Sequence, residues 1–316
     1  MLLSPEPLHI PDGFLSPIMA FLGWLLAVIV VGIALRQTRQ QLGERQVPLM
    51  GILAAFIFAA QAINFPVAAG TSGHLLGGAL AAIVMGPWAA TLIMTAVVSV
   101  QAFIFQDGGL LALGWNILNM GVLTAFTGYF SYRWLWGKIG SSTPARVAAS
   151  FAAAWISVEV GALSTAIELA LSNTSPLAIA LPAMVGVHAV IGIGEGLITG
   201  GAVRILQLSR PEVFEVGESA PGKMGATFIV CGLLLAIILA AFSPLASPNP
   251  DGLEFVAEQG DFLSRALDPS ITILPDYTVP FIKHPATTTI FAVMLGTLLV
   301  FALALIIGRK ASRSEG

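Results

Sequence analysis

The sequence predicts an all-α membrane protein built as a bundle of transmembrane helices. Three observations support this fold class. Of the 316 residues, 56% are hydrophobic and only 10% are charged. The mean hydropathy is +0.89, which is well above that of an ordinary soluble domain. The apolar residues also lie in runs approaching the roughly 20 residues that a helix needs to cross a bilayer.

Nine apolar segments are candidates for membrane crossings. The third is short and ends at Gly86-Pro87, where proline removes a backbone donor and favours a tight turn into the fourth. We expect seven crossings in a core and two in a C-terminal addition. The segments lie at about residues 17–35, 48–65, 75–85, 88–105, 115–136, 145–171, 177–206, 224–242 and 286–308.

The basic residues predict the orientation of the bundle. If the N-terminus is outside, twelve of the fourteen Lys and Arg residues fall in inner loops or at inner helix ends. Only Arg265 and Lys283 fall outside, and both lie in one long loop. By the positive-inside rule, we expect the N-terminus outside and the C-terminus in the cytoplasm.

Two histidines lie on the predicted outer side. His9 precedes the first apolar segment, and His74 lies in the glycine-rich stretch at the start of the third. Thr71 or Ser72 is placed to cap a helix beginning near His74. The positive end of that helix dipole disfavours the imidazolium form and leaves a neutral imidazole that can bind a metal. Spacing alone leaves two interpretations: a shared metal site, or a His74 that only bonds a loop carbonyl.

Ionisable residues in the apolar segments attract attention because they are costly in a bilayer. His188 and Glu195 are seven residues apart in one predicted helix and nearly share a face. They either support or relay the ion, or form an internal hydrogen-bonded pair that fixes the bundle. Glu159 and Glu168 lie on opposite faces of their predicted helix, so we do not expect them to act together.

Two asparagines share the face of another predicted helix. Asn116 and Asn119 are three residues apart and follow an outer loop, which would place them near a metal bound on the outer side. They either orient the metal ligands or form hydrogen bonds between helices.

Four long strings stand out in the core of the sequence. They are HIPDGFLSP at 9–17, PVAAGTSGHLLGGALAAIVMGPWAA at 66–90, QDGGLLALGWNILNMG at 106–121 and GVHAVIGIGEGLITG at 186–200. In this order, and over about residues 8–208, they resemble the CbiM/NikM substrate-capture membrane subunit of the cobalt and nickel energy-coupling-factor transporters. A further string at 250–260, PDGLEFVAEQG, resembles the small accessory subunit of the nickel systems, here fused behind the core.

The resemblance implies high-affinity uptake of Ni²⁺ or Co²⁺, with nickel slightly favoured and cobalt serving cobalamin biosynthesis. It implies that the ion is bound by a terminal amine, by the amide nitrogen and imidazole of His9, and by the imidazole of His74. Four nitrogens in a plane suit Ni²⁺, with low-spin Co²⁺ second. No cofactor is implied besides the transported ion. The implied partners are a coupling membrane subunit and a pair of cytoplasmic ATPase subunits, in the bacterial or archaeal cytoplasmic (inner) membrane.

The residues before His9 depart from the family pattern, in which one residue precedes this histidine. Eight residues precede it here, so the amine of Met1 lies seven residues too far upstream. We therefore expect the mature chain to begin at Leu8, whose amine would be the ligand. A UUG codon that initiates as Met, or cleavage of residues 1–7, would produce this start. The expected domains are an extension at 1–8, a metal-binding core at 9–222 and an accessory domain at 223–316.

The accessory domain has a predicted acidic outer loop at about residues 243–285. Its carboxylates could draw divalent cations towards the entrance of the site. The alternative is a solvated polar segment with one short helix at Glu254–Gln259. The resemblance implies that this domain helps to load the metal, by arranging the N-terminal loop.

Other functional classes receive less support. Residues 217–223 match most of a phosphate-binding GxxxxGK pattern, but Met224 replaces the Ser or Thr that would hold Mg²⁺, so we expect no ATPase activity. One alternative is a stand-alone proton-coupled metal permease that uses His188 and Glu195. Another is an intramembrane metalloenzyme, but the sequence has no HExxH or GxSxG motif. The single cysteine excludes a disulfide framework, and the net charge of −3 does not favour nucleic acid over membrane lipid as a partner.

Overall fold

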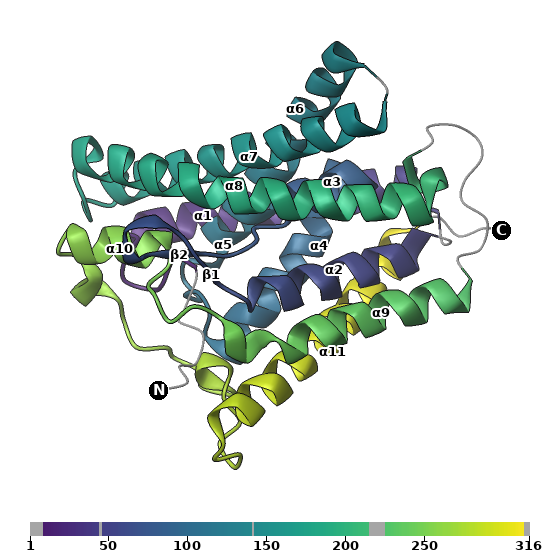
Figure 1. The fold of residues 1–316 in the computed structure, drawn as a ribbon. Helices are drawn as coiled ribbons and strands as arrows, with labels where there is room; N and C mark the ends of the chain where they lie inside the picture. The colour runs from purple at the N-terminus through teal and green to yellow at the C-terminus, as the bar shows by residue number, and fades with distance from the viewer. Residues whose placement is uncertain (1–8, 44–45, 141, 215–224, 313–316) are drawn as a thin grey trace.

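The structure is a computed structural model that describes residues 9–43, 46–140, 142–214 and 225–312. Figure 1 shows an all-α bundle of long helices, as predicted, with a small β-hairpin and several loops gathered at one end. The helices are α1 (Pro17–Gln41), α2 (Val47–Gln61), α3 (Gly78–Met85), α4 (Pro87–Val100), α5 (Leu113–Ile117), α6 (Thr124–Ile139), α7 (Thr143–Leu171), α8 (Leu177–Ser209), α9 (Ala226–Ala241), α10 (Gly252–Gln259) and α11 (Pro285–Ala311). The hairpin pairs β1 (Phe65–Pro66) with β2 (Ser72–Gly73) in antiparallel register.

Every predicted membrane segment contains a helix, and the chain is a multi-pass membrane protein. Within the described residues, five helices are long and apolar enough to cross a membrane: α1, α4 with its extension to Phe105, α7, α8 and α11. The helices α2 and α9 are apolar but shorter. The third and fifth predicted segments are not continuous α-helices in the structure.

The third segment is half extended and half helical. Its helix, α3, has only eight residues and ends at Gly86, whose φ of 81° makes the predicted turn into Pro87. The residues before α3 are extended and buried, so their polar groups need partners inside the bundle. The Glu195 carboxylate of α8 accepts the backbone N–H groups of Leu76 and Gly77 at 2.6 and 3.0 Å. The Gln61 side chain donates to the Leu76 carbonyl at 2.9 Å.

Two π-helical turns interrupt the regular helices on either side of the loop between α4 and α5. One, at Gln101–Phe105, continues α4 and ends at Gln106 in the left-handed conformation. The other, at Leu118–Leu123, lies between α5 and α6, so the fifth predicted segment is divided. Such turns occur mostly as single irregularities at functional sites. Asp107 follows the first turn, and Asn119 lies in the second.

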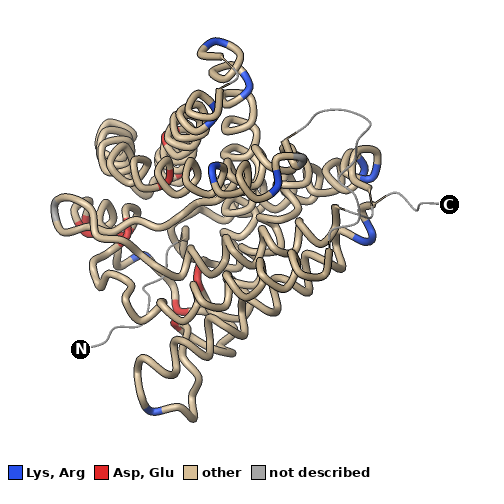
Figure 2. Tube along the Cα trace, turned by 45° about the vertical axis from the view of Figure 1, so that its right-hand side comes forward, with Lys and Arg blue, Asp and Glu red and all other residues tan. Residues whose placement is uncertain are grey.

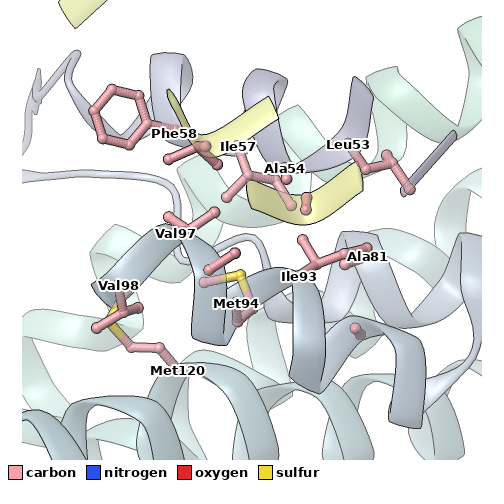
Figure 3. Packing of buried hydrophobic residues seen from close by; sticks show 14 of the residues in the cluster. Leu53, Ala54, Ile57, Phe58, Ala81, Ile93, Met94, Val97, Val98 and Met120 are labelled. Carbon is pink, nitrogen blue, oxygen red and sulfur yellow. The ribbon is translucent and has the colours of Figure 1, made fainter. Parts of the chain in front are cut away.

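The apolar core lies between α2, α3 and α4. Figure 3 shows Leu53, Ile57 and Phe58 of α2 facing Ile93 and Val97 of α4. Thirteen of the fifteen residues of α2 are buried, and they occupy every face of the helix. It lies against α4 as well as α9 and α11, so the C-terminal helices pack directly onto the rest of the bundle.

Charged residues are distributed unevenly along the bundle. Figure 2 shows most of the Lys and Arg residues towards the side where the C-terminus lies, and Asp and Glu residues mainly elsewhere. The described basic residues lie mostly near the end of α1, the end of α6, the start of α7, and the ends of α8 and α11. Their positions agree with a single charged end of the bundle.

Removing the Glu195 carboxylate should destabilise the bundle. Glu195→Ala leaves two buried N–H groups without an acceptor, at about 1–3 kcal/mol each, so the free energy of unfolding should fall by roughly 2–6 kcal/mol. Thermal unfolding in detergent measures this as a lower Tm. Glu159→Ala is the matched control, because neither carboxylate oxygen of Glu159 has a hydrogen-bond partner in the described residues. Equal Tm values for the two variants would contradict this role of Glu195.

Candidate metal site

The N-terminal segment is fixed to the loop before α5 by one carboxylate. Asp12 is almost fully buried and accepts three consecutive backbone N–H groups. Its Oδ2 accepts from Leu110 at 3.1 Å, and its Oδ1 accepts from Leu111 at 2.8 Å and Ala112 at 3.1 Å. Charge-assisted bonds of this kind are stronger than neutral ones. Asp12 therefore holds residues 9–16 in one place against the bundle.

Asn116 forms a second anchor, at Ile10. Its Oδ1 accepts the Ile10 N–H, and its Nδ2 donates to the Ile10 carbonyl, both at 3.1 Å. The Gly109 N–H also donates to that carbonyl, at 2.9 Å. Gly108 has a φ of 95°, and a Cβ there would lie 2.9 Å from the Cβ of His9. This position therefore requires glycine if the loop is to pass beside His9.

These anchors bring His9 next to His74. Both side chains are buried, with 5% and 9% of their surface exposed. Their ring centroids are 5.6 Å apart and the rings are nearly perpendicular. Two imidazoles that share one ion through bonds of about 2.0–2.1 Å place their centroids roughly 4.5–6.5 Å apart. The observed separation is thus compatible with both rings binding the same ion.

Each ring has one nitrogen engaged by an acceptor. Nδ1 of His9 lies 2.9 Å from Oδ1 of Asp107, and Nδ1 of His74 lies 3.0 Å from the Leu75 carbonyl. Metal-binding histidines usually donate their other ring N–H to a carboxylate or carbonyl in this way. Within the described residues, Nε2 of His9 is buried and has no hydrogen-bond partner. It is therefore a nitrogen available to a ligand.

The two imidazoles have opposite pKa shifts. Burial, with a smaller contribution from His9, lowers the pKa of His74 to about 4, so its ring is neutral at physiological pH. Burial also acts to lower the pKa of His9, but the neighbouring Asp107 carboxylate raises it above its ordinary value. A neutral imidazole is the form that binds metal. The sequence predicted a neutral His74 from a helix dipole, but in the structure burial is the cause.

Asp107 is held in turn by the accessory region. Tyr277 donates its hydroxyl proton to Oδ2 of Asp107 at 2.6 Å, and its ring stacks on Phe105 with the centroids 4.6 Å apart. The Gln101 amide lies 3.5 Å from the same hydroxyl. Residues separated by 170 positions in the chain thus form one hydrogen-bonded chain that ends at His9.

A cavity of about 70 Å³ lies beside the two histidines. It is far smaller than the roughly 300–1,000 Å³ of pockets for organic ligands, and its size suits a single ion. Its polar lining consists of His9, His74, Asn116, Asn119, Thr165, His188 and Asp251.

The structure separates some residues that the sequence suggested as partners. His188 and Glu195 are not bonded to each other: Nδ1 of His188 lies 2.8 Å from the Met184 carbonyl, and Glu195 accepts the N–H groups before α3. Of the two alternatives, the internal hydrogen-bonded pair is therefore wrong; a role of His188 beside the ion stays a prediction, and His188 lines the cavity. Both take nearer backbone partners, because a buried polar group needs one whatever its side-chain neighbours.

The asparagines and the predicted helix cap are also resolved by their hydrogen bonds. Asn116 orients the N-terminal segment, whereas Asn119 donates to Glu168 of α7 at 3.1 Å and so joins two helices. Thr71 and Ser72 do not cap a helix at His74, because α3 begins only at Gly78. Leu8 and the phosphate-loop-like residues 217–223 lie outside the described residues.

The segment between α9 and α11 covers this site. The N–H and hydroxyl groups of Ser72 donate to the Pro250 and Asn249 carbonyls, each at 2.8 Å. The Leu267 N–H donates to the Asp12 carbonyl at 2.8 Å. The short helix expected at 254–259 is present as α10, but the segment before it is not a freely solvated loop.

Asp251 is the acidic residue of this segment that reaches the cavity. Only 4% of its surface is exposed, and its Oδ1 accepts the Glu254 N–H at 2.7 Å, which caps α10. Burial raises the pKa of Asp251 to about 8, against the opposing effect of that hydrogen bond. By contrast, Glu258 and Asp268 of the same outer segment are exposed.

Four residues near the site were not identified from the sequence. Asp12 and Asp107 lie in strings that carry the family resemblance, and an Asp beside glycine in an outer loop could have marked each. Asp251 belongs to the predicted acidic loop at 243–285, for which the sequence left cation attraction and solvation open, and the Asp-Gly start of a helix is its only local signal. For Tyr277 the sequence offers no signal, because its partner Asp107 is 170 residues away.

Two family models together match nearly the whole described chain. The family described as "Cobalt uptake substrate-specific transmembrane region" matches residues 9–213. The family described as "PDGLE domain" matches residues 226–313.

Relatives that match nearly the whole chain, and relatives that match about two thirds of it, are named as transport proteins. A putative fused nickel transport protein NikMN of Archaeoglobus fulgidus is 36% identical, over 96% of this chain and 99% of that protein. A fused nickel transport protein NikMN of Rhodobacter capsulatus is 27% identical, over 93% and 95%. The cobalt transport protein CbiM of Sorangium cellulosum is 32% identical, over 68% and 99%. A crystal structure of a transition metal transporter is 34% identical, covers 68% of this chain and 100% of that chain, and superposes with a TM-score of 0.59.

Asn116→Ala should weaken metal binding without unfolding the bundle. It removes both side-chain bonds to Ile10, so His9 is held less firmly, and we expect the affinity for Ni²⁺ to fall about 10- to 100-fold. Titration of the purified chain with Ni²⁺ measures this. Asn64→Ala is the control, because the buried Asn64 side chain has no hydrogen-bond partner in the described part of the chain. Unchanged affinity in Asn116→Ala would show that the anchor is dispensable.

Proposed function

Because the chain belongs to the cobalt uptake substrate-specific transmembrane family and ends in a PDGLE domain, we propose that it captures Ni²⁺ or Co²⁺ for an ATP-driven energy-coupling-factor transporter. The chain is a component of metal uptake and not an enzyme. Nickel is favoured as the substrate, since the similar proteins that share the fused arrangement are named as nickel transport proteins.

The single observation that carries the proposed site is the pair of buried imidazoles. His9 and His74 come from positions 65 residues apart, and their rings lie within 5.6 Å beside an ion-sized cavity. A buried imidazole nitrogen without a partner is costly in a protein interior, so the open Nε2 of His9 requires an explanation. A bound ion supplies one.

Backbone nitrogens complete the proposed ligand set. His9 and His74 are assigned as side-chain ligands. The amine of Leu8, if the chain begins there, is a further donor, and the amide of His9 is one if the ring turns to bind through Nδ1. Among the described residues, no group of three or more His, Cys, Asp and Glu side chains is placed to hold a metal ion. Two imidazoles need additional donors, and nitrogen donors in a plane favour Ni²⁺.

The rest of the transporter follows from the proposed role. The core at 9–222 would present the site on the outer face of the cytoplasmic membrane, with the C-terminus in the cytoplasm, and the accessory domain at 223–316 would cover it. A coupling membrane subunit and a pair of ATPase subunits would supply the energy. The distribution of Lys and Arg residues supports this orientation.

Loss of either imidazole should abolish tight metal binding. We expect His9→Ala and His74→Ala each to lose stoichiometric binding of Ni²⁺ and Co²⁺, because the remaining donors cannot complete the site. Metal analysis after purification, followed by titration, measures this and shows which metal the chain retains. His284→Ala is the control, since His284 is exposed and caps α11. Stoichiometric binding by both single variants would overturn the proposed site.

The purified chain alone should not transport metal. In proteoliposomes with a pH gradient we expect no uptake of Ni²⁺, and with the coupling subunit, the ATPase pair and ATP we expect uptake. The alternative permease would use His188 and Glu195 as a proton relay, but the Glu195 carboxylate is occupied by two backbone N–H groups. Uptake by the chain alone, driven by the pH gradient, would support the permease instead.

A further inference from the structure

A divalent ion in the cavity needs negative charge close by. The imidazoles of His9 and His74 bind metal in their neutral form, so they leave the charge of the ion uncompensated. In a buried site of low dielectric constant, an uncompensated charge is costly. Asp107, which contacts His9, supplies one negative charge at this site.

The second carboxylate near the ion comes from the accessory region. Asp251 lines the same cavity as His9 and His74, and only 4% of its surface is exposed. Its one hydrogen bond to a described backbone donor, from Glu254, uses Oδ1. In its ionised form it brings, with Asp107, two negative charges to a site that receives two positive ones.

We propose that Asp251 is the counter-charge that the accessory domain contributes to the bound metal ion. The carboxylate acts on the ion through space and increases its affinity. This inference rests on the proposed function, because it requires the ion to lie beside His9 and His74. It makes the accessory domain part of the site and not only a cover over it. The raised pKa of Asp251 agrees with this role, since its anion lacks compensation until a cation arrives.

The position of Asp251 at the start of α10 allows its charge to be separated from its structural role. Asp and Asn are equally favourable at the N-cap position, because in each the side-chain oxygen accepts the same backbone N–H. Asp251→Asn therefore keeps the cap of α10 and removes only the charge. Asp251→Glu keeps the charge but is a poorer cap with a longer side chain.

Titration of the full-length chain in detergent with Ni²⁺ tests the proposal. We expect Asp251→Asn to bind about 10-fold or more weakly than the wild type, and Asp251→Glu to bind more tightly than Asp251→Asn. Asp268→Asn removes the same charge from an exposed position of the same segment, where solvent screens it, and should bind as the wild type does. If Asp251→Asn does not fold, Asp251→Ser, which also caps a helix without charge, replaces it in the comparison.

Two results would overturn the role of Asp251. One is wild-type affinity in Asp251→Asn. The other is weaker binding by Asp251→Glu than by Asp251→Asn, which would assign the effect to the helix cap. A parallel titration of His74→Ala separates this inference from the proposed function. If His74→Ala still binds tightly, the metal site itself is wrong; if it does not bind while Asp251→Asn binds normally, only the counter-charge is wrong.

Discussion

The anchoring of the N-terminal segment is the interaction on which the rest of the site depends. Fixing the backbone of one residue costs about 1–2 kcal/mol of conformational entropy, so a short segment does not become ordered without compensating contacts. Asp12 accepts three N–H groups of the loop before α5, and Asn116 pairs with both backbone groups of Ile10. These five bonds place His9 inside the bundle. The accessory segment then packs against an ordered surface, with the Leu267 N–H donating to the Asp12 carbonyl.

His74 reaches the site for a different reason, the break in the third membrane segment. A continuous helix would leave no extended chain in the bundle on which His74 could face His9. The extended residues are tolerated because Glu195 and Gln61 satisfy the polar groups of Leu76 and Gly77. Glu195 thus affects the site through the backbone. Its carboxylate has a structural role that also explains why an acid lies on the apolar helix α8.

Much of the helical framework could be predicted from the sequence, because apolar runs bounded by loops determine where helices form in a membrane. The candidate ligands His9 and His74 were also identifiable, from their place beside glycine-rich and loop sequence and from the family resemblance. The extended half of the third segment was not, because Leu75 and Leu76 are as apolar as helical residues. Glu195, which accepts the Leu76 N–H, is 119 positions away.

The polar partners show the same limit. Asp107 and Tyr277 meet only after the bundle has formed, and no local pattern links positions 170 residues apart. The spacing of His188 and Glu195 correctly suggested a shared helix, α8, but spacing does not show which backbone groups compete for a side chain. Asp251 illustrates a related limit, because Glu258 and Asp268 of the same segment are exposed and only the packing of α10 shows that Asp251 is buried.

The contact between His9 and Asp107 constrains which nitrogens of His9 can bind an ion. If the amide nitrogen of His9 binds the metal, the ring must bind through Nδ1, which alone lies near enough to its own amide to close a chelate. In the structure Nδ1 faces Asp107 at 2.9 Å, and one nitrogen cannot donate a proton to a carboxylate and bind a metal at the same time. The chelate therefore requires the ring to turn about its Cβ–Cγ bond, whereas binding through Nε2 requires no turn but leaves the amide out. In either arrangement Asp107 stays in place, because Tyr277 holds its other oxygen. The accessory region thus fixes one carboxylate of the site and supplies another, which gives a physical reason for joining it to the core in a single chain.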